Sequence, residues 1–151
     1  MAALAGLMFP TIQKQIVRVR TMTSAKQVAS VFQRARLEAV RRNVEGEVEI
    51  VGRRVVATVD TVTFFGLLSA GVEFGAPPGE TVVDGFAPDD KAVFTVAGGV
   101  RDSGAFRIEG PTHNNWVEVR IEPAATGRVE VRKWDGAAFK AQGEGGNSWT
   151  W

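Results

Sequence analysis

The sequence has no cysteine and only one histidine among its 151 residues. The absence of cysteine excludes disulfides and thiolate metal sites. The lone histidine, His113, lies in a turn-rich stretch, and we interpret it as a loop residue. Ser103 and Asp102 could complete a triad with it, but no nucleophile elbow surrounds the serine. We therefore expect a protein that is not an enzyme, with no catalytic residue and no cofactor.

The usual spacings of metal and phosphate sites are also lacking. Asp84, Asp89 and Asp90 cluster near a glycine, but they miss the spacing of a calcium loop and its closing glutamate. Turn formation is the better interpretation, with a weak calcium site as the open alternative. The glycine-rich stretch 98–104 has no Gly-Lys-Ser/Thr ending, so it predicts a hairpin turn and not a phosphate loop.

No apolar run is long enough to cross a bilayer, which takes roughly 20 residues. The only candidate is residues 1–12. The charge is unevenly distributed: residues 1–45 hold eight basic and two acidic side chains, net +6, and the remainder is net −5. A basic segment joined to an acidic body suggests surfaces that pair between neighbouring subunits. A solvated helix face is the alternative interpretation.

Apolar residues of the N-terminal region recur at helical spacing, which predicts one long amphipathic helix from about residue 3 to about residue 44. Pro10 should kink it, because proline lacks the amide hydrogen that a helix needs. Upstream, a stripe of Ile12, Ile16, Val19 and Thr23 continues toward the apolar start of the chain. We expect a sheet to pack on the C-terminal half of this helix and to bury Val28, Phe32, Ala35 and Ala39.

After Gly46 the apolar period changes to two, which is typical of strands. Gly52-Arg53 predicts a tight hairpin between two such runs. Further strands are expected at 71–74, 92–96, 105–109, 116–121 and 128–132. The expected fold is α+β, with a helix (1–45), an antiparallel β-sheet domain (46–134) and a glycine-rich C-terminal tail (135–151). We expect that tail to be irregular and its Trp149 and Trp151 to fold back onto the sheet.

Three groups of residues together resemble the GspH/FimT family, the minor pilins of type II secretion systems and type IV pili. Residues 2–10 resemble the end of a pilin membrane segment, where small and aliphatic residues run up to a proline. Residues 33–43 are similar to the end of the family's helix. The series 94–99, 104–108, 117–121 and 126–129 matches its phenylalanine strand, glycine turn, following strands and final Gly-Arg hairpin.

The resemblance implies a structural subunit that assembles with other pilin-like subunits through its N-terminal helix. It also implies an inner-membrane anchor in the full-length form, a sheet domain in the periplasm or in an extracellular filament, and secreted cargo as a partner. The basic leader, the processing glycine and the apolar stretch with its glutamate have no counterpart before residue 2. We therefore expect the sequence to be N-terminally truncated relative to the family.

Two alternatives stay open at this stage. A DNA-binding minor pilin for natural transformation would use Arg128, Arg132, Lys133 and Trp134 of the last hairpin. Glu130 lies between these cations, where DNA-binding members tend to carry a second basic residue, so we expect DNA binding to be weak or absent. The other alternative is a ligand-binding β module on a helical stalk.

Overall fold

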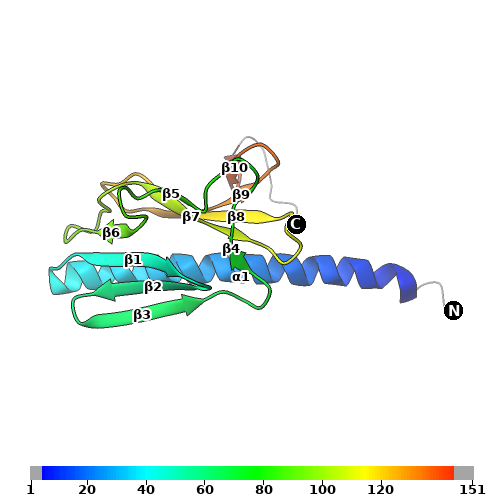
Figure 1. Cartoon of the computed structure of the whole chain (residues 1–151), viewed down its shortest axis with the longest axis horizontal. Helices are drawn as coiled ribbons and strands as arrows, with labels where there is room; N and C mark the ends of the chain where they lie inside the picture. Colours follow the sequence, from blue (N-terminus) through cyan, green and yellow to red (C-terminus); the bar gives the residue numbers. More distant parts are fainter. Residues whose placement is uncertain (1–4, 145–151) are drawn as a thin grey trace.

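The computed structural model describes residues 5–144 and consists of one long helix, α1 (Ala5–Arg42), followed by short strands (Figure 1). The strands are β1 (Gly46–Val51), β2 (Arg54–Val59), β3 (Val62–Leu67), β4 (Glu73–Phe74), β5 (Val83–Gly85), β6 (Ala92–Phe94), β7 (Gly104–Glu109), β8 (Trp116–Ile121), β9 (Val129–Trp134) and β10 (Phe139–Ala141). This α+β fold confirms the class predicted from the sequence. Residues 3 and 4 of the predicted helix, together with Trp149 and Trp151, lie outside the described residues.

The strands form two antiparallel sheets, which the sequence did not separate. The first sheet has the order β3-β2-β1-β6, and its β1–β2 hairpin turns at Gly52-Arg53 as predicted. The second has the order β10-β9-β8-β7-β4, with β5 also paired to β7. Figure 1 shows both sheets on the C-terminal half of α1, while its N-terminal half projects beyond them.

Burial divides α1 into two halves. No side chain between residues 10 and 20 is buried, whereas buried positions recur every three or four residues from residue 21 on. These positions are Thr21, Ser24, Ala25, Val28, Val31, Phe32, Ala35 and Ala39. Val28, Phe32, Ala35 and Ala39, the four residues expected to face the sheet, are fully buried. We call residues 10–20 the projecting half and residues 21–42 the packed half.

Phe32 lies where the helix and both sheets meet. Its ring centroid is 6.1 Å from that of Phe94 in the first sheet and 5.2 Å from that of Phe106 in the second. Phe86, just after β5, packs edge-on against it at 6.3 Å. These rings join the three elements into one core.

α1 continues through Pro10, where the sequence predicted a kink. Pro10 lies near the start of the helix, so its missing N–H removes one backbone hydrogen bond far from the packed half. Within the described residues, no helix combines the length and the apolarity needed to cross a membrane.

β3, β5 and β10 were not expected from the sequence. β3 passes close to α1 at Gly66, where an added Cβ would lie 2.8 Å from Cγ of Gln27 and 3.0 Å from Cγ2 of Val31. Only glycine fits there without moving the helix side chains. β10 pairs with β9 inside the segment that the sequence analysis treated as irregular.

Candidate functional site

The projecting half of α1 exposes a row of aliphatic side chains. Ile12, Ile16 and Val19 are 53%, 45% and 64% exposed. They are spaced by four and three residues, so they lie along one side of the helix. We call them the aliphatic row. The helical repeat of about 3.6 residues places them on the side of α1 opposite to the buried residues of the packed half, and the described part of the chain leaves them exposed.

Two cations of the projecting half lack the polar contacts that Arg36 and Arg42 make in the packed half. Among residues 5–144, Lys14 and Arg20 have no salt bridge, and the first acidic residue in the sequence is Glu38. In the packed half, Arg36 donates a hydrogen bond to the Gly98 carbonyl at 2.7 Å, and Arg42 lies 2.9 Å from Glu38. Positive charge therefore goes unneutralised where the helix leaves the body.

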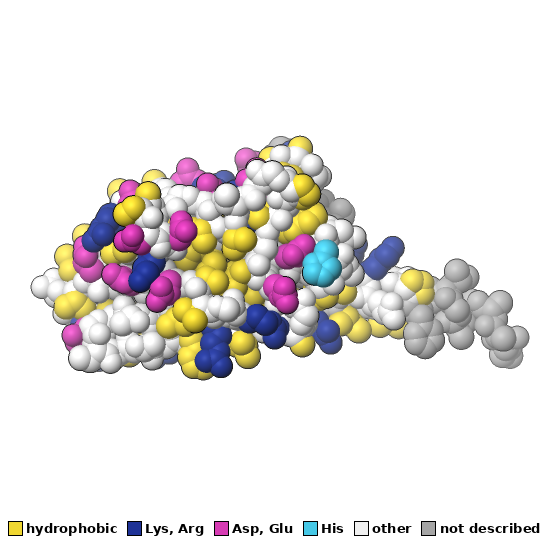
Figure 2. Space-filling view, viewed as in Figure 1, with side chains coloured by type: hydrophobic (Ala, Val, Ile, Leu, Met, Phe, Trp, Pro, Cys, Tyr) yellow, Lys and Arg dark blue, Asp and Glu magenta, His cyan; other side chains and the backbone are white. Residues whose placement is uncertain are grey.

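A groove of about 700 Å³ lies between this helix segment, the β7–β8 loop and the end of β9. Its polar lining includes Lys14, Arg18, Arg20, Asn114, Asn115 and Lys133. We call it the basic groove. Burial, together with the nearby Arg18 guanidinium, lowers the pKa of Lys133 below its usual value. Figure 2 shows that the Asp and Glu side chains on the viewed face lie over the body and not on the projecting helix.

The four residues proposed for DNA contact do not form one positive surface. Arg128 is exposed and lies 3.3 Å from Glu130, and Arg132 lies 2.9 Å from the same carboxylate. Arg132 also lies 3.5 Å from Glu122. Two of the three cations therefore share one acidic partner.

Strand alternation separates the third cation from the other two. Lys133 follows Arg132 in β9, so its side chain points to the opposite face, where it lines the basic groove. Trp134 packs edge-on against Phe139 of β10, with 5.0 Å between ring centroids. Lys133 thus lines a groove formed with the helix, on the other face of β9 from Arg132.

We expect duplex DNA to bind weakly and to dissociate at moderate salt. Each phosphate contact releases about one counterion, so roughly three cations would give a slope of log K against log salt of about −3 as the steepest value, if all three reached phosphates at once. Titrations of fluorescent DNA at several salt concentrations measure this slope. Micromolar binding at physiological salt that Arg128→Ala/Lys133→Ala abolishes would contradict the expectation and favour DNA uptake.

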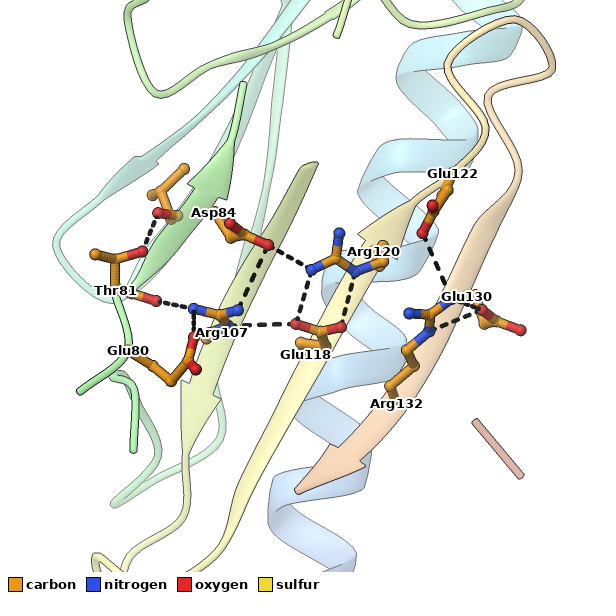
Figure 3. Close-up of polar contacts among 10 residues, drawn as sticks. Glu80, Thr81, Asp84, Arg107, Glu118, Arg120, Glu122, Glu130 and Arg132 are labelled. Carbon is orange, nitrogen blue, oxygen red and sulfur yellow. Dashed lines mark hydrogen bonds and ion pairs between the residues drawn. The ribbon is translucent and has the colours of Figure 1, made fainter. Parts of the chain in front are cut away.

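The outer face of the second sheet carries a network of five charged residues: Glu80, Asp84, Arg107, Glu118 and Arg120 (Figure 3). Arg107 and Glu118 are only 5% and 1% exposed. The Glu118 carboxylate lies 3.3 Å from Nε of Arg107 and 2.8 Å from Nε of Arg120. We call this set the charged network.

Arg107 is covered from two sides, by the segment that precedes β5 and by strand β10. Its guanidinium lies 2.8 Å from Glu80, donates to the Thr81 carbonyl at 2.8 Å and lies 4.9 Å from the ring centre of Phe139. Asp84, considered above for calcium, pairs with Arg107 and Arg120. Within residues 5–144, no three His, Asp or Glu side chains gather closely enough to hold a metal ion.

Ser103 and His113, two residues of the triad considered from the sequence, lie apart. Ser103 precedes β7 and His113 follows it, so the whole strand separates them. The His113 side chain is 70% exposed, with Nδ1 3.3 Å from Glu109.

A long helix with one half packed on antiparallel sheets and the other half projecting is a pilin-like α+β architecture. Comparisons with protein-family models, with curated proteins and with solved structures found no match to this chain.

Proposed function

We propose that this chain is a structural subunit of a bacterial filament, a minor pseudopilin or minor pilin, that joins neighbouring subunits through the projecting half of α1. The observation that carries the proposal is the aliphatic row, exposed on a helix whose other half is packed. The motifs shared with the GspH/FimT family support the finer assignment to a type II secretion pseudopilus or a type IV pilus.

Burying the aliphatic row supplies the driving force for assembly. A fully buried Ile or Val side chain contributes about 1.5–3 kcal/mol relative to an exposed one. In this proposal the row of one subunit packs against a different surface of its neighbour. Contacts of this heterologous kind build an open filament when the rotation between neighbours does not close into a ring. The opposite charges of the N-terminal segment and the body favour a staggered arrangement of subunits.

Replacing the row by serine, in Ile12→Ser/Ile16→Ser/Val19→Ser, should weaken self-association of the purified chain at least tenfold. The reason is that about 1.4 kcal/mol corresponds to a factor of ten, and each side chain contributes more than that when buried. Sedimentation velocity over a range of protein concentrations measures the effect.

The matched control is Leu37→Ser/Val40→Ser, which removes aliphatic side chains that are 67% and 48% exposed on the packed half of the same helix. It should leave association unchanged. A wild-type chain that stays monomeric at every concentration, or a control as damaging as the triple variant, would rule out assembly through the row.

A further inference from the structure

In the part of the chain that the structure describes, β3 is the only edge strand longer than three residues. The other edge strands, β4, β5, β6 and β10, span two or three residues each, whereas β3 spans six. Proteins commonly protect a long edge with charged residues, proline or a bulge. β3 reads Val-Thr-Phe-Phe-Gly-Leu and pairs with β2 without interruption, so it has none of these protections. Figure 1 shows it along the lower edge of the molecule.

The backbone of β3 offers hydrogen-bonding groups on the side away from β2. The Leu68 amide donates to the Arg53 carbonyl at 3.1 Å, which identifies a hydrogen-bonded pair of the β2–β3 ladder. Such pairs alternate along antiparallel strands, so Thr63, Phe65 and Leu67 direct their N–H and C=O groups outward. Within residues 5–144 no hydrogen bond reaches these outward groups, and all three residues are exposed. A further strand could therefore pair with them.

Two guanidiniums flank this edge, one on each face of β3. Arg34 of α1 lies 4.3 Å from the ring centre of Phe64 on the helix side. Arg54 of β2 lies 4.9 Å from the ring centre of Phe65 on the outer side. Neither cation forms a salt bridge with another described residue, and β3 itself has no acidic residue. The edge therefore combines unpaired backbone groups with positive charge that no carboxylate neutralises.

We propose that β3 binds an extended acidic segment of another protein as an added antiparallel strand. In this mode of binding the main-chain hydrogen bonds give affinity, and the alternating side chains give specificity. Acidic side chains of the added strand lie on the helix side, beside Arg34. Its aliphatic side chains lie on the outer side over Phe65 and Leu67, which are 56% and 52% exposed. The antiparallel direction continues that of the whole first sheet.

A second copy of this chain fits the edge less well than an acidic segment does. Two β3 strands paired with each other would bring both copies of Arg34 and Arg54 to one seam, and neither β3 supplies a carboxylate there. Like charges that meet across paired strands are destabilising. Because this edge is separate from the aliphatic row, binding of the segment does not require filament assembly.

The probe is the peptide acetyl-Glu-Val-Glu-Val-Glu-Val-Glu-amide, titrated into the full 151-residue chain and followed by fluorescence anisotropy. The chain should bind it. A peptide of the same composition, acetyl-Glu-Glu-Val-Val-Glu-Glu-Val-amide, should bind at least about tenfold more weakly, because it cannot place all its valines on one face of a strand. No saturable binding up to about 1 mM peptide, or equal binding of the two peptides, would overturn the proposal.

The variant Arg34→Gln/Arg54→Gln should lose about fivefold in affinity for the alternating peptide, the size expected of two partly exposed ion pairs. The matched control Lys14→Gln/Arg128→Gln removes the same charge from exposed positions away from β3 and should lose less than about twofold. Equal losses in the two variants would show attraction by net charge and contradict a contact at β3. The serine variant of the aliphatic row should bind the peptide as the wild type does, so this proposal and filament assembly can fail separately.

Amide hydrogen exchange, measured by NMR, locates the contact. The peptide should slow exchange at Thr63, Phe65 and Leu67 and leave Phe64 and Gly66 unchanged, since their amides already bond to β2. Methylating the valine backbone nitrogens of the peptide should abolish binding, whereas methylating the two inner glutamate nitrogens should not, because only the valine N–H groups face β3. Binding without slower exchange at the three amides would overturn the proposal. Slower exchange that depends on protein concentration without peptide would overturn it in favour of a second copy.

Discussion

Replacing Phe32 by alanine should lower the free energy of unfolding by about 3–5 kcal/mol, the usual cost of removing a buried aromatic ring. The side chain is fully buried and contacts three other phenylalanine rings. Because Phe94 and Phe106 belong to different sheets, the cavity left behind touches both sheets and the helix. Urea unfolding followed by circular dichroism measures the loss.

Phe65→Ala is the matched control, since this ring is 56% exposed on the outer face of β3. It should change the free energy of unfolding by less than about 1 kcal/mol. A similar effect of the two substitutions would mean that the core is not centred on Phe32.

Glu118→Ala should lower the free energy of unfolding by about 1–3 kcal/mol, because the buried Nε donor of Arg107 loses its acceptor. Glu80 and Asp84 still neutralise the Arg107 guanidinium. Glu118 is 1% exposed and accepts from Arg107 and Arg120. Arg107 is itself buried, so water cannot replace the lost carboxylate. The same unfolding experiment measures the change.

Glu130→Ala on the neighbouring strand is the control. This carboxylate is 24% exposed and pairs with Arg128 and Arg132 near the surface, where ion pairs contribute at most about 1 kcal/mol. The double variant Arg107→Met/Glu118→Leu should recover more than half of the loss, since neither charge is then buried alone. No recovery would contradict the account of a buried donor left without its acceptor.

The parts of the fold that follow from local periodicity could be predicted from the sequence. The helical stripe through Val28 and Phe32 predicted which part of the helix packs on the sheets, because residues spaced by three and four share one helix face. The Gly52-Arg53 turn fixed the first hairpin, since it joins two alternating runs.

The elements that were missed depend on tertiary contacts or are very short. β5 and β10 span three residues each, too few for alternation to show. β3 carried a usable signal, β-branched and aromatic residues after Asp60, which adopts a positive φ of 56° in the turn. The division into two sheets depends on which strands contact Phe32 from either side.

Only part of the candidate site could be predicted from the sequence. The basic groove brings Arg18 together with Lys133, residues far apart in the chain, so no local pattern could show it. Alternation alone, however, could have separated Lys133 from Arg132 in the alternative interpretation as a DNA-contact hairpin. It could also have placed Glu118 and Arg120 on one face of β8, which is the start of the charged network.

The continuity of α1 determines how a pull on the projecting half would reach the body. Residues 10–20, on which the pull would act, and Phe32 belong to one continuous helix. No flexible linker between them would extend first. Tension along its axis shears the whole buried face from Thr21 to Ala39 at once, instead of peeling a strand one hydrogen bond at a time. Resistance to such tension is governed by the unfolding barrier. Phe32 and its neighbouring rings are therefore both the centre of the core and the contacts that resist a pull on the helix.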